Sequence, residues 1–252
     1  MKKVVPLLLA TSLAACGGGG GSTNTESTPE SNLLAINADN AELLARSIYN
    51  VFDAIGSIES ILQGVQLPDT GVDEIACDQG SITLTTDLGA DNIPNAAGEY
   101  IQGVFNNCVY EDTAEVLNGT AKLTIDYWVS DQNLALDLDF DLDYQYADEF
   151  ETASGTMGIA LTGSAVEITT SMDFYSTKFD GSVQISTGIP ILYEVGDFYP
   201  TSGELTADGA NGSYLTLNAD TGDNDTVYYY VSDGANYTES DEIDWITLDS
   251  DY

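Results

Sequence analysis

Histidine is absent from the sequence, and only five of the 252 residues are lysine or arginine. Without histidine there can be no Ser-His-Asp or Cys-His catalytic arrangement, no histidine general base and no histidine metal ligand. The P-loop and the G-x-S-x-G nucleophile motif are also missing, and so few basic side chains cannot clamp a phosphate group. These absences remove the common enzyme classes and predict a protein without catalytic activity.

The scarcity of basic residues, set against 42 acidic ones, gives a formal net charge of −37. A field of this sign repels phosphate backbones, which excludes nucleic acid as a partner, and it also repels anionic lipid headgroups. Extreme acidity favours solubility, above all in salty surroundings where screening weakens self-repulsion. A requirement for a divalent cation is the second interpretation of the charge.

The sequence also lacks an apolar run long enough to span a bilayer, which takes roughly 20 residues. The mostly apolar stretch 4–15 follows Lys2 and Lys3 and ends in small residues, which is the order of a secretory signal. The block LAACG at 13–17 resembles the lipobox of bacterial lipoproteins. That resemblance implies cleavage before Cys16 and anchoring of the new N-terminus in a membrane by acyl chains such as palmitate. Because glycine rather than aspartate follows the cysteine, the resemblance favours the outer membrane.

Cysteine is rare as well, and three cysteines are an odd number for an oxidising compartment. Lipidation of Cys16 leaves Cys77 and Cys108 as a pair. Neither a histidine nor a C-x-x-C spacing supports a metal or redox role for that pair. We therefore predict a structural disulfide between Cys77 and Cys108, whose loop of about 32 residues should stabilise the fold by roughly 3 to 4 kcal/mol.

Residues 17–32 consist of five glycines, polar residues and one proline, so they cannot form a core. We expect a flexible tether with a reach of roughly 20 to 25 Å, the value for a random coil of this length. The predicted organisation is a lipoprotein signal peptide at 1–15, the lipidated cysteine and tether at 16–32, and a single folded domain at 33–252.

The first part of that domain has helical periodicity, because apolar residues recur at steps of three and four across 37–64. Asp39 or Asn40 is the expected N-cap, and Gly64 is the expected end. The polar face of this helix is acidic, which argues against binding to a membrane surface. We expect its apolar stripe to pack on the rest of the domain.

From residue 81 onward the sequence has the character of a β protein. In 134–146 apolar and polar residues alternate almost without a break, and the aspartates at 137, 139, 141 and 143 share the polar face. Further strands are predicted at 81–88, 100–110, 121–129, 156–163, 165–175, 182–187, 189–195, 203–209, 213–219, 226–232 and 244–248. Tight hairpin turns are predicted at Asn118-Gly119 and Asn211-Gly212, and Asp180-Gly181 and Asp233-Gly234 are further turn signals.

One helix followed by many strands predicts a mainly β fold with one N-terminal helix, an antiparallel up-and-down meander that curls into a half-open barrel around the helix. This order of elements resembles the half-open barrels of lipoprotein carriers in the bacterial envelope. The pattern of Cys77-x-x-Gly80, Phe105-Asn-Asn-Cys108, Leu117-Asn-Gly119, the segment 199–205 and Trp245 is similar to uncharacterised outer-membrane lipoproteins of Gram-negative bacteria. That resemblance implies a disulfide-tied β domain and no particular chemistry.

Calcium is the one cofactor that the sequence suggests, because Asp220, Asp223 and Asp225 crowd hard oxygen ligands into one loop. Their spacing departs from the EF-hand pattern, and aspartate, asparagine and glycine are ordinary turn residues. A solvated turn is therefore the stronger interpretation. A solvent-facing row is likewise the stronger interpretation of the aspartates at 137–143.

The sequence as a whole predicts a monomeric, non-catalytic, lipid-anchored protein, a structural or interaction module at the outer membrane, on its periplasmic face or at the cell surface. A second hypothesis is a carrier of an apolar ligand, either a lipid or a lipoprotein, in the hollow of the curled sheet. It predicts an apolar cavity that side chains leave unfilled. A third hypothesis is a calcium-dependent surface adhesin.

Overall fold

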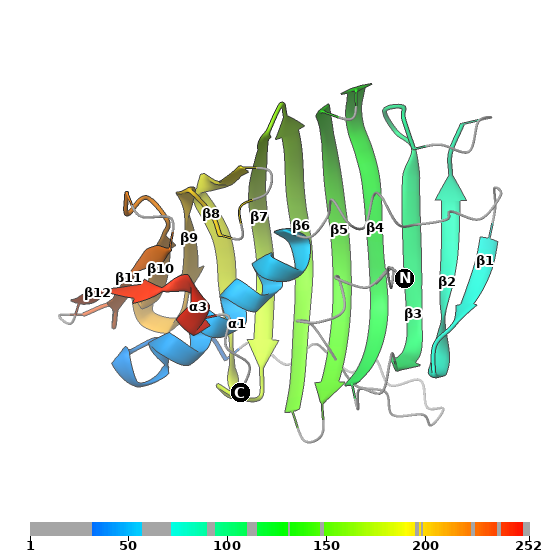
Figure 1. The fold of residues 1–252 in the computed structure, drawn as a ribbon. Coiled ribbons are helices and arrows are strands. Elements are labelled where there is room, and N and C mark those ends of the chain that lie inside the picture. Colours follow the sequence, from blue (N-terminus) through cyan, green and yellow to red (C-terminus); the bar gives the residue numbers. More distant parts are fainter. Residues whose placement is uncertain are drawn as a thin grey trace.

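The structure is a computed structural model that describes residues 32–56, 72–89, 94–109, 115–130, 132–146, 149–194, 197, 199–222, 225–235 and 238–248. Most of these residues lie in one antiparallel sheet of twelve strands, which run from β1 at one edge to β12 at the other in the order of the chain (Figure 1). Within the described ranges no pairing joins β1 to β12, so the sheet is open. The predicted antiparallel meander is confirmed.

The helices are α1 (Ala38–Gly56), the 3-10 turn η1 (Ala210–Gly212) and the short α3 (Trp245–Leu248). The strands are β1 (Val72–Ala76), β2 (Gln79–Asp87), β3 (Tyr100–Val109), β4 (Glu115–Ser130), β5 (Asn133–Tyr146), β6 (Glu149–Thr162), β7 (Ala165–Ser176), β8 (Gly181–Glu194), β9 (Ser202–Asp208), β10 (Tyr214–Asn218), β11 (Thr226–Ser232) and β12 (Thr238–Asp244). In Figure 1 the sheet is broad from β1 to β7, and α1 crosses one of its sides near β6 to β9.

The side of the sheet that faces α1, called here the inner side, carries the core. Strand β5 shows the division most clearly, because Leu136, Leu138 and Leu142 are at most 3% exposed while the aspartates between them face the solvent. Alternation along a strand sends successive side chains to opposite faces, which explains this pattern. From α1, Leu44 and Ile48 join the same core cluster. The opposite, outer side of the sheet is polar.

Helix α1 begins earlier than predicted. Asn37 is its N-cap, because its Oδ1 accepts a hydrogen bond from the backbone N–H of Asp39 at 2.8 Å. Asn40 Oδ1 accepts in return from the N–H of Asn37 at 3.0 Å, the reciprocal arrangement of a capping box. The predicted caps, Asp39 and Asn40, are therefore wrong, since they occupy the first turn. The predicted end at Gly64 lies outside the described residues.

The residues just before α1 are bound to the sheet. Leu34 donates its N–H to Ser182 O, and its carbonyl accepts from the N–H of Ala210, both at 2.8 Å. The N–H of Ile36 donates to Ser213 Oγ at 3.0 Å. The segment 32–36 therefore ties the start of β8 to the turn between β9 and β10.

One predicted turn is wrong. Asn118-Gly119 lies inside β4, next to a bulge in β3 where the backbone of Asn107 has a positive φ of 48°. The side chain of Asn118 accepts a hydrogen bond from the N–H of Asn107 at 2.8 Å. Gly119 has a φ of 107°, and a Cβ there would collide with the carbonyl oxygen of Asp141. Glycine is therefore needed here for close approach between strands rather than for a turn.

The other three predicted turns are confirmed at the β7–β8, β9–β10 and β11–β12 connections. The strands predicted at 182–187 and 189–195 form one strand, β8, whose pairing with β9 is interrupted by bulges. The segment 244–248, predicted as a strand, is mainly α3, because the chain turns inward and buries Trp245 and Leu248. The sequence does not predict the edge strands β1 and β12. Their sequences, VDEIA and TESDEID, do not alternate apolar with polar residues.

Among the described residues, the helices are too short or too polar to serve as a membrane span.

Candidate functional site

Two of the predicted site residues fall outside the described residues. These are Cys16, the predicted lipidation site, and Asp223 of the predicted calcium loop. Lipidation therefore stays a prediction of the sequence.

The disulfide between Cys77 and Cys108 is confirmed, with the two Cα atoms 5.4 Å apart. Cys77 follows β1 and Cys108 lies near the end of β3, so the bond reaches across β2. The N–H of Asp78 donates to Val109 O at 2.8 Å beside it. Because β1 has only five residues, this bond fastens a short edge strand to the interior of the sheet.

The predicted calcium loop connects β10 to β11, and its described aspartates are exposed. The N–H of Asp220 donates to Asn218 Oδ1 at 2.9 Å, as in an Asx turn. The carbonyl of Asp225 accepts from the N–H of Trp245 at 2.9 Å and so connects the loop to α3. No group of three or more acidic or cysteine side chains that could hold a metal ion occurs among the residues that the structure describes.

The aspartate row on β5 faces the solvent on the outer side of the sheet. Asp137, Asp139 and Asp141 are exposed, whereas Asp143 is partly buried. Burial raises the pKa of Asp143, and the neighbouring charge of Asp141 raises it further. Lys122 lies opposite Asp139 in the register, but its Nζ sits 4.4 Å from the ring centroid of Tyr100. The row therefore consists of solvated carboxylates on one face of the strand, and it does not enclose a binding site.

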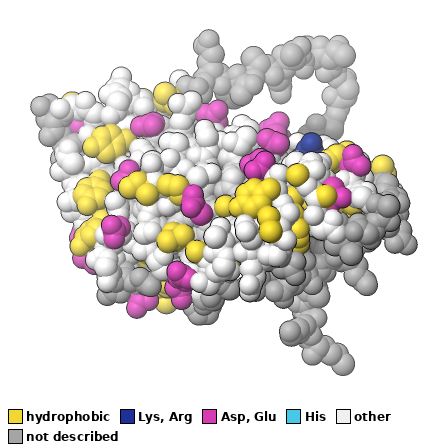
Figure 2. Space-filling view, turned by 90° about the horizontal axis from the view of Figure 1, so that it is seen from above, with side chains coloured by type: hydrophobic (Ala, Val, Ile, Leu, Met, Phe, Trp, Pro, Cys, Tyr) yellow, Lys and Arg dark blue, Asp and Glu magenta, His cyan; other side chains and the backbone are white. Residues whose placement is uncertain are grey.

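The other two basic side chains that lie beyond the predicted signal are also engaged. Arg46 contacts Glu42 on α1, with 2.7 Å between Nη2 and Oε1. Lys178 lies between Glu149 and Glu151, as described below. Figure 2 shows the consequence, since acidic side chains are spread over this view of the surface, basic ones are scarce, and hydrophobic side chains gather between the acidic ones.

Glu151 is a buried carboxylate, only 5% exposed, on the inner side of β6. Its Oε1 accepts a hydrogen bond from Ser176 Oγ at 2.8 Å and lies 3.7 Å from Lys178 Nζ. Burial raises the pKa of Glu151, although the Lys178 charge and the Ser176 hydrogen bond oppose the rise. Burial lowers the pKa of Lys178, but the two glutamates outweigh burial and raise it overall. These groups connect the start of β6 to the β7–β8 turn, which is a structural role.

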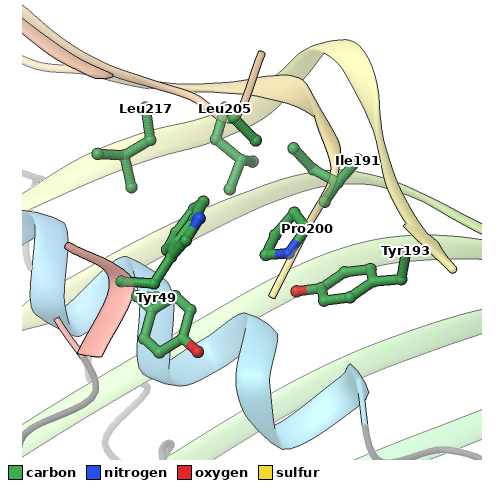
Figure 3. Close-up of a pocket in the computed structure, with 8 residues that line it drawn as sticks. Tyr49, Ile191, Tyr193, Pro200, Leu205 and Leu217 are labelled. Carbon is green, nitrogen blue, oxygen red and sulfur yellow. The ribbon is translucent and has the colours of Figure 1, made fainter. Parts of the chain in front are cut away.

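An apolar pocket lies where α1, α3 and the strands β8 to β10 meet. In Figure 3, Tyr49 projects from α1, Leu205 and Leu217 lie across the pocket from it, and Tyr193 and Pro200 close one side. The complete lining consists of Tyr49, Ile191, Tyr193, Pro200, Leu205, Leu217, Ala219 and Trp245. The centre of a water molecule can occupy only about 10 Å³ of it, which is just enough for one water molecule. A lipid could enter only if this space widened.

Trp245 forms the centre of the aromatic group at this pocket. Its ring lies 5.2 Å from that of Tyr49 and 6.3 Å from that of Tyr199, between centroids. The indole is 4% exposed, and its Nε1 has no hydrogen-bond partner among the described residues. In the sequence, only the resemblance to uncharacterised lipoproteins connects the segment 199–205 with Trp245. Nothing in their spacing indicates that they meet Tyr49.

Comparison with known proteins gives no match, whether to protein-family models, to curated proteins or to solved structures. The class that the structure itself defines is a curled, mainly β, disulfide-tied domain with an apolar inner side and an acidic, polar outer side.

Proposed function

We propose that this protein is a non-catalytic, lipid-anchored component of the cell envelope that acts at the outer membrane as a structural or interaction module. The observation that carries the proposal is the lipobox-like block LAACG at 13–17, placed directly after a signal-like segment. A glycine-rich segment, which we propose to be a flexible tether, follows it in the sequence, and the next segment, 32–36, is hydrogen-bonded to the sheet.

The described part of the domain supports a role without catalysis. Perturbed pKa values mark candidate active sites when they occur in a cleft. Here the groups with raised pKa values are Asp143, Glu151, Lys178 and Tyr229. None of these four lines the apolar pocket. Burial and neighbouring acidic charges account for the carboxyl and phenol shifts without a reactive group.

The test of the anchor is metabolic labelling with radioactive palmitate in a Gram-negative host that expresses the full chain, followed by separation of inner and outer membranes. We expect label on the protein and recovery with the outer membrane. Cys16→Ser should lose both. The matched control is Cys77→Ser with Cys108→Ser, which should keep the label because it leaves the lipobox intact. Unlabelled wild-type protein, or label that survives Cys16→Ser, would contradict the proposal.

A further inference from the structure

Three tyrosines lie together on the outer side of the sheet, away from the core. Tyr214 is on β10, and Tyr228 and Tyr230 are on β11, with their ring centroids 6.5 Å apart. The register places Tyr214 opposite Ser232 and Thr216 opposite Tyr230, so Tyr214 and Tyr230 are diagonal neighbours. We call these three rings the tyrosine face.

The tyrosine face is not needed to fill the core. The inner side of the same two strands is already filled by Leu215, Leu217, Val227 and Val231, each at most 3% exposed. Tyr230, in contrast, keeps 38% of its surface exposed. Large aromatic rings that lie on a polar sheet face, outside the core, mark a surface suited to contact with another molecule.

Carboxylates border the tyrosine face on both sides. Glu204 on β9 and Glu242 on β12 lie in one row with Tyr228, two strands away on one side and one strand away on the other. Asp208 on β9 is directly opposite Tyr214. The sequences of β9 to β12 contain no lysine or arginine. The rings therefore lie in a negative field with no cation of their own strands to balance it.

The composition of this surface indicates the chemistry of its partner. Tyrosine surrounded by serine, threonine and asparagine is typical of surfaces that recognise proteins, because the ring supplies rigid contact area and the polar groups supply adaptable hydrogen bonds. Arginine and lysine bind over tyrosine rings and pair with carboxylates. Lys122 already lies over a tyrosine ring on this side of the sheet, with its Nζ 4.4 Å from the ring centroid of Tyr100. An anionic partner would be repelled.

We propose that the tyrosine face docks a protein partner that presents arginine or lysine side chains, with the cations over the rings and against Glu204, Asp208 and Glu242. This inference rests on the proposed role as an interaction module, but it does not depend on the lipid anchor. Arginine is the better fit, because its planar guanidinium stacks on a ring and pairs with a carboxylate at the same time.

The test measures the affinity of the full chain, as isolated from its host, for a fluorescent decapeptide of alternating arginine and glycine at physiological salt. We expect Tyr228→Ala with Tyr230→Ala to weaken binding roughly threefold to thirtyfold, the range for the loss of one or two cation–ring contacts. Tyr228→Phe with Tyr230→Phe keeps the rings and should keep most of the affinity. Far-ultraviolet circular dichroism establishes that each variant is folded.

The matched control separates a specific surface from a general negative field. Glu204→Gln, Asp208→Asn and Glu242→Gln remove three charges at the tyrosine face, whereas Asp137→Asn, Asp139→Asn and Asp141→Asn remove three exposed charges from β5 on the same side of the sheet. The first set should weaken binding several times more than the second. Equal losses would overturn the proposal, as would an unchanged affinity in the alanine variant. Binding of a neutral oligosaccharide at the tyrosines in place of the peptide would also overturn it. In each of those cases palmitate labelling at Cys16 would leave the anchor proposal standing.

Discussion

Replacement of Lys178 by methionine removes the one positive charge beside the buried carboxylate of Glu151. The lysine Nζ lies 3.7 Å from Glu151 Oε1 and 3.2 Å from Glu149 Oε2, and Ser176 would be the remaining hydrogen-bond donor to Glu151. Methionine keeps most of the aliphatic length of lysine, so the substitution tests the charge rather than the packing. We expect a clear loss of stability at neutral pH.

The size of the loss can be bounded. Breaking a buried ion pair by removing one partner costs roughly 3 to 5 kcal/mol. Glu151 can escape part of that cost by binding a proton, and neutralising a carboxyl group of ordinary pKa 4.5 at pH 7 costs about 3.4 kcal/mol. Because the side chain of Lys178 keeps 29% of its surface exposed, solvent screens part of the interaction. We therefore expect a decrease of about 2 to 3 kcal/mol in the free energy of unfolding.

The stability deficit of Lys178→Met should depend on pH, because it arises from the charge of Glu151. Burial already raises the pKa of Glu151 above that of the unfolded chain, and loss of the Lys178 charge should raise it further. The folded variant then holds a proton that the unfolded chain has released, so its stability falls as the pH rises above 4.5 through the raised pKa. The deficit against the wild type should therefore be largest at neutral pH and should shrink near pH 4.5. In the wild type, the contribution of Lys178, whose pKa is raised, is present below 10.5 and is lost at higher pH.

Urea unfolding followed by circular dichroism at neutral and acidic pH measures these differences. Two controls accompany it. Lys178→Met combined with Glu151→Gln should recover much of the loss, because no buried charge remains. Glu149→Gln should cost less than about 1 kcal/mol, because the Glu149 side chain is 46% exposed and solvent screens its pairing. An equal deficit at both pH values, or no recovery in the double variant, would refute the reasoning.

The remaining predictions concern the edge strand, a glycine that lies close to the neighbouring strand, and the net charge. Cys77→Ser with Cys108→Ser should lower the free energy of unfolding by roughly 3 to 4 kcal/mol, and a reductant should then have no further effect on the variant. Gly119→Ala should cost roughly 2 kcal/mol or more, because its φ is 107° and the new Cβ meets a backbone carbonyl, whereas Gly163→Ala, with φ 67° and open space, should cost only about 1 kcal/mol. Equal losses at the two glycines, measured by urea unfolding, would show that the close approach to Asp141 is unimportant. Added sodium chloride should raise the melting temperature by roughly 2 to 4 °C for each kcal/mol of repulsion that it screens, and a flat response in calorimetry would contradict self-repulsion by the −37 charge.

The parts of the fold that the sequence predicts well are those in which one signal dominates. The alternation in 134–146 defines β5 and its inner and outer sides, and the spacing of apolar residues defines the helix whose described part is α1. Cysteine parity identifies the Cys77–Cys108 bond. In each case the signal can be read from the sequence without knowing which distant strands pair.

Prediction fails where distant contacts decide the structure. Asn118-Gly119 has the local preference of a turn, yet the bulge at Asn107 and the close approach of Asp141 keep it inside β4. Segment 244–248 has the composition of a strand but becomes α3, because Trp245 packs between Tyr49 and Tyr199. The tyrosine face is likewise invisible in the sequence. YYY at 228–230 does not show which rings face outward until the register with β10 and β12 is known.

The claim of a lipid-anchored envelope protein is tested most directly by the intact mass of the protein extracted from membranes of a Gram-negative host that expresses the full chain. The account predicts a chain that begins at Cys16, carries the mass of acyl and diacylglycerol groups on that residue, and is two hydrogens light for the Cys77–Cys108 bond. A chain that keeps residues 1–15, or one that begins elsewhere with an unmodified Cys16, would contradict it.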